Sequence, residues 1–154
     1  MKLVVLKFGG TSVADVSQIK KIAIKVKNEV NLGNKVIVVV SAMAGVTNNL
    51  IDLVKSISET PSYSEYDVVV STGEQVTSAL LAIALDSLNI KARSWLGWQV
   101  PIISNKSYGK AVIEDIKTDK ILDFLKKNQV AIISGFQGIT DENRITTLGR
   151  GGSD

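Results

Sequence analysis

Three short, largely apolar runs constrain the fold of this chain more than any other feature of its sequence. They cover residues 2–8, 35–40 and 130–134, and valine, isoleucine and leucine dominate all three. Runs of this length and composition are typical of strands buried on both faces of a parallel sheet. We therefore predict three such strands, in a sheet covered on both faces.

Segments with helical periodicity separate these runs. Residues 16–30 carry an apolar stripe. Asp15 just before them and Gln18 in their first turn are spaced as a capping box, and Gly33 stands where a C-terminal glycine belongs. Further helices are predicted at about 47–57, 72–88 and 118–127. The second of these opens on Thr72 and Gln75, which are again spaced as a capping box.

The shorter elements complete the pattern. Residues 66–70 fit either a helix or a strand, residues 91–95 and 99–104 fit short strands that bend at Gly97, and residues 141–144 fit a hairpin turn. Alternating buried strands and helices predict an α/β fold. Its expected form is a three-layer α/β/α sandwich with a mainly parallel central sheet.

The absence of two residue types narrows the chemistry. The 154 residues include neither cysteine nor histidine. Disulfide frameworks, thiolate zinc sites, histidine metal ligands and Ser-His-Asp or Cys-His nucleophile systems are therefore excluded. Any reaction must use carboxylates, lysine, arginine, hydroxyls, backbone N–H groups or a metal held by oxygen.

Charge and hydropathy set expectations about partners and location. The net charge is +3, and the lysine clusters fall on segments with helical periodicity, where a solvated helix face explains them better than a nucleic-acid surface. No signal peptide is visible, and no run approaches the length of about eighteen apolar residues that a spanning helix needs. We expect a cytoplasmic protein without nucleic-acid or membrane partners.

Polar, glycine-rich segments follow the predicted strands. They start at Gly9, Ser41, Gly135 and Gly151, and the carboxyl ends of parallel strands are where ligands bind in open sheets. Lys7 precedes the first segment and suits phosphate oxygens. Neither a P-loop nor a Gly-x-Gly-x-x-Gly motif is present. The residues alone therefore indicate a phosphate or carboxylate site at this edge of the sheet.

Five blocks make this indication specific. They are residues 7–13 (KFGGTSV), 40–43 (VSAM), 71–75 (STGEQ), 135–138 (GFQG) and 146–154 (TTLGRGGSD). In this order they resemble the aspartokinases of the amino-acid kinase superfamily. The resemblance implies an amino-acid kinase-like fold and the reaction of ATP with L-aspartate to ADP and 4-phospho-L-aspartate, the first step toward lysine, threonine and methionine. It also implies ATP as cosubstrate, with Mg²⁺ carried by the nucleotide and no protein ligand assigned to the metal.

The resemblance further implies roles for individual residues. The expected catalytic residues are Lys7, Glu74 and Asp154. The expected aspartate-binding residues are Ser41, Thr47, Glu74, Arg150 and Ser153. The expected nucleotide-phosphate-binding residues are Lys7, Phe8, Gly9, Gly10, Thr11, Ser12, Gly151 and Gly152.

Plainer interpretations stand beside these roles. A lysine before two glycines can be a surface residue, Glu74 can be a first-turn acid favoured by the helix dipole, and Ser41 and Thr47 can be ordinary caps. Residues 107–110 read SYGK where the family more often has His-Gly-Lys, so no imidazole acts there. Two tryptophans are expected to serve packing or an interface: Trp95 and Trp98.

In the resembled family the kinase domain continues past the length of this chain. We therefore expect residues 1–154 to be the N-terminal portion of such a domain, with the C-terminal half missing and no ACT regulatory domain. An unfinished sheet predicts an apolar edge, and so a homo-oligomer or association with the missing half. The alternatives are an amino-acid kinase acting on glutamate or a nucleotide, and a non-catalytic remnant or split-subunit fragment that binds aspartate or a partner chain without turnover.

Overall fold

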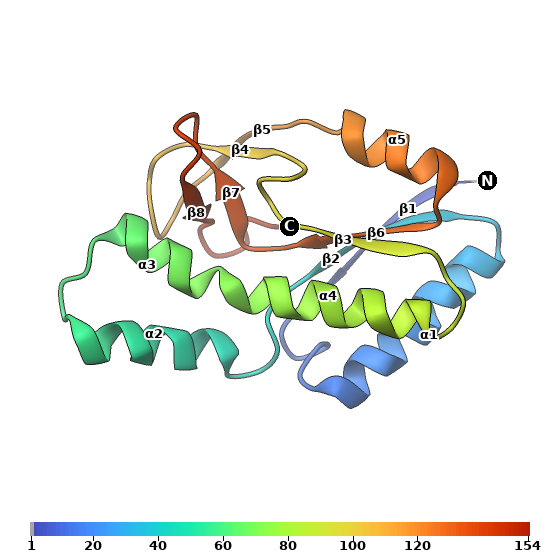
Figure 1. The fold of residues 1–154 in the computed structure, drawn as a ribbon, viewed down its shortest axis with the longest axis horizontal. Coiled ribbons are helices and arrows are strands. Elements are labelled where there is room, and N and C mark those ends of the chain that lie inside the picture. The colour runs from blue at the N-terminus through green and yellow to red at the C-terminus, as the bar shows by residue number, and fades with distance from the viewer. Residues whose placement is uncertain (1) are drawn as a thin grey trace.

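The computed structural model describes residues 2–154 and shows a parallel sheet at the centre of the molecule (Figure 1). Sheet A has the strand order β1-β2-β6-β3, and every neighbouring pair is parallel. Its strands are β1 (Leu3–Phe8), β2 (Lys35–Val40), β6 (Val130–Ser134) and β3 (Ala92–Trp95). The three predicted strands are therefore neighbours in one parallel sheet.

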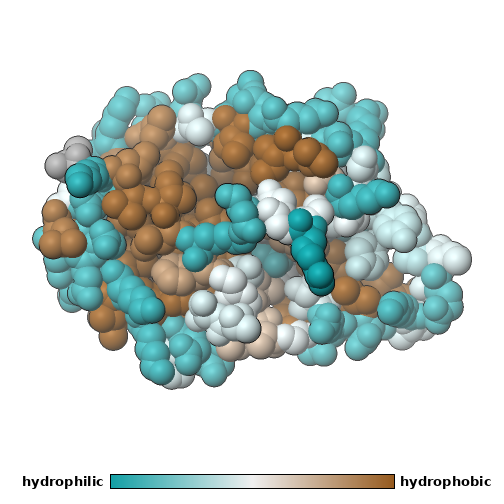
Figure 2. Space-filling view, turned by 180° about the vertical axis from the view of Figure 1, so that it is seen from behind, coloured by the Kyte–Doolittle hydropathy of each residue, from teal (hydrophilic) through white to brown (hydrophobic). Residues whose placement is uncertain are grey.

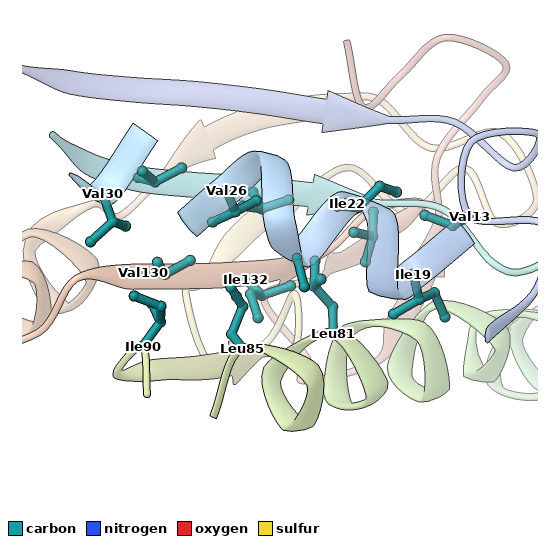
Figure 3. Close-up of a cluster of buried hydrophobic side chains, with 14 residues drawn as sticks. Val13, Ile19, Ile22, Val26, Val30, Leu81, Leu85, Ile90, Val130 and Ile132 are labelled. Atoms are coloured by element: carbon teal, nitrogen blue, oxygen red, sulfur yellow. The ribbon is translucent and has the colours of Figure 1, made fainter. Parts of the chain in front are cut away.

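Helices lie on both sides of sheet A. Figure 1 shows α1 (Val16–Asn31) and α4 (Thr72–Asp86) below the sheet and α5 (Asp119–Lys127) above it. The main core lies between α1, α4 and the sheet, and Figure 3 shows side chains from all three elements pointing toward one another, among them Ile19, Ile22, Val26, Leu81, Leu85, Val130 and Ile132. The predicted α/β/α architecture with a parallel central sheet is confirmed.

A second, smaller sheet stands beside the first. Sheet B has the order β5-β4-β7-β8. Its strands are β5 (Ile113–Ile116), β4 (Ile102–Ser104), β7 (Gln137–Ile139) and β8 (Ile145–Thr147). The β7–β8 hairpin was predicted from its turn. Strand β5 was not, because most of its residues are exposed and form no apolar run.

One expectation about sheet A is wrong. Strand β1 is not buried on both faces, since Leu3 is 50% and Val5 62% exposed. The reason is its place at the edge of the sheet, away from β6, the strand against which α5 packs. Figure 2 shows a broad hydrophobic area on the face seen from behind, the side on which β1 lies in Figure 1. An apolar run indicates a strand but not how many of its faces are covered.

The helical capping predictions had opposite outcomes. The Gln18 N–H donates to Asp15 Oδ1 at 2.9 Å, so the first box has its N-terminal hydrogen bond. Thr72 does not cap α4: its hydroxyl donates backward to the Val69 carbonyl at 2.8 Å. The backbone is already helical there, because α3 (Tyr63–Val70) leads into α4 through Ser71 in a helical conformation. The ambiguous residues 66–70 are thus helical.

The continuous helix formed by α3 and α4 also concerns the expectation that the protein has no membrane partner. Tyr63–Asp86 is, by length and composition, the one described helix that could cross a membrane, with a mean hydropathy of 1.5. That expectation concerned an uninterrupted apolar run, and this helix contains none of that length, since Glu65, Asp67 and Glu74 lie within it. Of its most apolar window, 44% is buried within the protein, where Leu81 and Leu85 pack on sheet A.

The tryptophans lie at the other face of the sheet. Trp95 is buried in a second core under α5 and meets Phe124 edge to face, with ring centroids 5.5 Å apart. The packing role predicted for Trp95 is confirmed. Trp98 is half exposed and stays a candidate for an interface.

Candidate functional site

The glycine-rich segments meet at the carboxyl edge of sheet A. The strand ends are in register, with Phe8 opposite Val40 and Val40 opposite Ser134. Hydrogen bonds continue past the ends: Ser41 N–H donates to the Phe8 carbonyl at 3.1 Å and Gly135 N–H to the Val40 carbonyl at 2.9 Å. The edge predicted to bind a ligand is therefore assembled from three segments distant in sequence.

A cavity of about 560 Å³ opens at this edge. Its volume is in the range of small-molecule sites. The predicted site residues in its wall are Lys7, Gly10, Ser41, Thr47, Glu74, Arg150, Gly151, Gly152 and Ser153. Phe136 also lines the cavity, so all five sequence blocks contribute to its wall.

Some predicted residues lie outside the cavity wall. Phe8 ends β1, and the Gly9 carbonyl accepts hydrogen bonds from the N–H groups of Ser12 and Val13 at 2.9 and 3.2 Å. This closes a tight turn in which Thr11 and Ser12 are exposed. These residues form the turn beside the cavity, and their phosphate-binding role stays a prediction.

Helix α2 (Val46–Ile57) starts at the cavity. Gly45 precedes it with a φ of 77°, a left-handed conformation that favours glycine, and no side chain caps its first N–H groups. Thr47 and Asn48 in its first turn line the cavity. A helix N-terminus attracts negative charge. Asn48 was missed at the sequence level, although its place in the first turn of a predicted helix beside a candidate site pointed to it.

Glu74 is the buried acid of the site. It lies in the first turn of α4 and is only 4% exposed. Its Oε1 accepts a hydrogen bond from the Ala42 N–H at 3.1 Å, whereas its Oε2 has no hydrogen-bond partner. Burial raises the pKa of Glu74 from 4.5 to about 7, and backbone hydrogen bonds oppose the rise. A buried carboxylate oxygen without a donor is suited to a cationic ligand group.

The C-terminal loop forms a second, exposed part of the cavity wall. Arg150 is exposed and lines the cavity, and Gly151 follows with a φ of 72°. The loop is anchored by Ser153, whose Oγ accepts a hydrogen bond from the Phe136 N–H at 2.7 Å. Asp154 lies outside the cavity wall and forms an ion pair with Lys7. Of the residues predicted to be catalytic, Lys7 and Glu74 therefore line the cavity, and Asp154 contacts one of them.

The charges of the cavity match an amino acid beside a phosphate. Lys7 and Arg150 supply cations, Glu74 supplies a carboxylate, and Ser41 and Thr47 add hydroxyls. Within residues 2–154 no three acidic side chains cluster as a metal site would require. The arrangement can bind both charged groups of an amino acid and neutralise phosphate oxygens.

Sequence comparison identifies the family of the chain and several related proteins. The model of the amino acid kinase family matches residues 2–154. An aspartokinase of Rickettsia felis is 54% identical over 157 aligned residues, which cover all of this chain and 39% of the relative. An aspartate kinase of Pseudomonas putida is 50% identical, with all of this chain and 38% of the relative aligned. The chain thus spans about two fifths of the length of these curated relatives.

Structural comparison agrees with this result. The chain resembles E. coli aspartokinase III in complex with aspartate and ADP, with a TM-score of 0.83, 25% identity, and coverage of 99% of this chain and 44% of that one. It also resembles aspartate kinase from Synechocystis, with a TM-score of 0.80, 44% identity, and coverage of 98% and 24%. The cavity described above lies within the aligned part of the chain.

Proposed function

The chain belongs to the amino acid kinase family, and from this premise we propose that it provides the aspartate-binding part of an aspartate kinase. The reaction would transfer the γ-phosphoryl group of ATP to the side-chain carboxylate of L-aspartate. One observation carries the proposal: Glu74 has a buried, unpartnered oxygen in the same cavity as Arg150 and Lys7. The names of the relatives, and the aspartate and ADP bound to one of them, support it.

Aspartate would be held by both of its backbone charges. The Glu74 carboxylate would accept hydrogen bonds from the substrate ammonium group, which would satisfy Oε2. Arg150 would bind the α-carboxylate with two parallel hydrogen bonds. Ser41, Thr47 and Ser153 offer hydroxyls to the remaining oxygens. The substrate's side-chain carboxylate would then be directed at the nucleotide.

Phosphoryl transfer would need charge neutralisation rather than a base. The attacking carboxylate is already ionised at neutral pH, because an ordinary aspartate side chain has a pKa of about 4. Its oxygen forms the new bond to the γ-phosphorus while the bond to the bridging oxygen breaks, and ADP leaves with that electron pair. Lys7 and the N–H groups of Gly10 and Gly151 would neutralise phosphate charge. Mg²⁺ would arrive on the nucleotide.

The direct test is calorimetric titration of the protein with L-aspartate and with succinate. Succinate carries the same two carboxylates and lacks the ammonium group. We expect L-aspartate to bind at least about tenfold more tightly, because succinate leaves Glu74 unpaired. Equal affinities would contradict the proposed site.

Turnover is tested separately with ATP, aspartate and hydroxylamine, which traps the acyl phosphate as a hydroxamate. Hydroxamate formation would support the full kinase reaction in this chain. Aspartate binding without hydroxamate would instead support the second candidate, a non-catalytic chain that binds aspartate without turnover.

Association with another chain is a further part of the proposal. The exposed face of β1, with Leu3 and Val5, is the apolar surface through which we propose self-association or association with another chain. Light scattering should then detect species larger than 16.5 kDa, the mass of one chain. A monomer at high concentration would contradict self-association.

A cytoplasmic location, like a role in lysine biosynthesis, also belongs to the proposal.

A further inference from the structure

Asp67 is a fully buried carboxylate outside the cavity. It lies on α3, is 0% exposed, and does not line the cavity wall. Its Oδ2 accepts hydrogen bonds from the N–H groups of Gly109 at 3.0 Å and Thr147 at 2.8 Å. Its Oδ1 accepts a hydrogen bond from the Thr147 hydroxyl at 2.7 Å. All three partners are donors, as a buried carboxylate requires.

The two ends of this contact lead along the chain to Glu74 and Arg150, the two residues proposed to bind the charged groups of aspartate. From Asp67 the chain runs helically through α3, Ser71 and the start of α4, and it reaches Glu74 after about two turns. From Thr147, the last residue of β8, it passes Leu148 and Gly149 to Arg150. The carboxylate of Asp67 therefore joins the helical segment that leads to Glu74 to the end of β8, which leads into the loop that carries Arg150.

The backbone segments between Asp67 and these two residues are themselves held by hydrogen bonds and close packing. The Ser71 carbonyl accepts a hydrogen bond from Gln137 Nε2 at 2.7 Å, and a Cβ on Gly73 would come within 2.7 Å of the Ala42 Cβ. On the other side, Leu148 N–H donates to the Phe136 carbonyl at 2.8 Å and Gly149 N–H to the Ala111 carbonyl at 3.0 Å. The backbone on both sides of the Asp67 contact is therefore held in place, which leaves little free chain to take up a change at that contact.

We propose that Asp67 is a positioning residue that sets the separation between the Glu74 carboxylate and the Arg150 guanidinium, and so makes the site selective for an α-amino acid. The ammonium and α-carboxylate groups of such a ligand are attached to one carbon atom. The Glu74 carboxylate and the Arg150 guanidinium must therefore lie at one short, fixed separation. This inference rests on the proposed function of Glu74 and Arg150. Of the residues proposed to bind nucleotide phosphates, Lys7 lies near the carboxyl end of β1 and is not tied to Asp67 by these hydrogen bonds, whereas Gly151 and Gly152 follow Arg150 in the same loop.

The chain offers a matched control for this contact. Glu65, also on α3, forms an exposed ion pair with Arg144, which precedes β8. This pair joins nearly the same two elements as Asp67 does, but in solvent, where ion pairs contribute little. Glu65→Gln therefore removes a connection between α3 and the β8 segment without disturbing a buried carboxylate.

The experiment compares ligand affinities of the full chain by calorimetry. We expect Asp67→Asn to weaken L-aspartate binding by about tenfold or more and ATP binding by a smaller factor, because a neutral amide oxygen accepts the two N–H groups less strongly than a carboxylate does, and the Thr147 hydroxyl must reorient to accept from the amide nitrogen. Thr147→Val, which removes only the hydroxyl donor, should weaken aspartate binding by a smaller factor. Glu65→Gln should leave both affinities unchanged.

Several outcomes would overturn the inference. Unchanged aspartate affinity in a folded Asp67→Asn variant would do so, as would equal losses of aspartate and ATP affinity, which indicate a merely structural role. If Asp67→Asn does not fold, Thr147→Val decides by the same criteria.

Hydrogen exchange separates this inference from the proposed function. If the unaltered protein does not bind aspartate, the proposed site fails, but amide exchange still tests the positioning contact. Faster exchange at residues 147–152 in Asp67→Asn, with unchanged exchange in β2 and β6, would support the contact's role. Uniform or unchanged exchange would refute it.

Discussion

The two sides of the cavity differ in how far their charged groups are buried and hydrogen-bonded before a ligand binds. On one side, Glu74 is buried, holds one hydrogen bond from the Ala42 backbone, and keeps a second oxygen unpartnered. On the other side, Arg150 is exposed and Lys7 is paired with an exposed carboxylate, Asp154. The buried side is desolvated in advance, so a charge there has a large effect. The exposed side remains screened by water until a ligand covers it.

The largest expected effect comes from removing the charge on the buried side. Glu74→Gln keeps the shape of the side chain and should weaken L-aspartate binding by about 100-fold or more, because a buried ammonium group would lose its counter-charge. Titration calorimetry measures the loss. Succinate, which has no ammonium group, should bind the variant and the unaltered protein alike. A loss under about threefold for aspartate would mean that Glu74 does not hold the ammonium group.

The same burial predicts how stability depends on pH. Because the pKa of Glu74 rises from 4.5 to about 7 on folding, the folded chain keeps a proton there that the unfolded chain has released. The free energy of unfolding contributed by Glu74 should therefore fall as the pH rises through this range, and level off above it. The fall is at most about 3 kcal/mol.

Urea unfolding from about pH 5 to about pH 8 measures this fall, with Glu74→Gln as the reference. The stability of the unaltered protein should decrease relative to the variant as the pH rises. A difference between the two proteins that stays constant with pH would show that Glu74 titrates normally.

A smaller effect is expected on the exposed side. Arg150→Ala should weaken L-aspartate binding by about tenfold, the loss of a charge-assisted hydrogen bond that forms only when the ligand covers the arginine. Unfolding midpoints should stay the same, since Arg150 is exposed and lines only the cavity. An effect larger than that of Glu74→Gln would reverse the comparison between the two sides.

The smallest effect is expected at the rim. Asp154→Asn removes the ion pair with Lys7 and should change aspartate affinity by less than about twofold, because the pair is exposed and lies outside the cavity wall. The same variant frees Lys7, so ATP affinity should rise slightly or stay constant. A tenfold loss of aspartate affinity would assign Asp154 a direct part in binding aspartate.

Much of the fold could be predicted because its signals are local. The runs at 35–40 and 130–134 indicated buried strands, and the Asp15 cap and Gly33 delimited the first helix. The site edge was also predictable, because the carboxyl ends of parallel strands gather loops that carry Lys7, Ser41 and Gly135. The resemblance in sequence blocks then singled out Glu74 and Arg150 among polar residues that local patterns do not distinguish.

What only the tertiary structure decided was burial, because burial depends on neighbours that are distant in sequence. The sequence by itself determined the parallel strands, the glycine-rich edge and the residue types available for chemistry. It did not determine that β1 leaves Leu3 and Val5 exposed, because that follows from which helices cover which part of sheet A. Nor did it determine that Glu74 keeps an unpartnered oxygen, or that Asp67, an unremarked acid in an ambiguous segment, accepts hydrogen bonds from Thr147 eighty positions away.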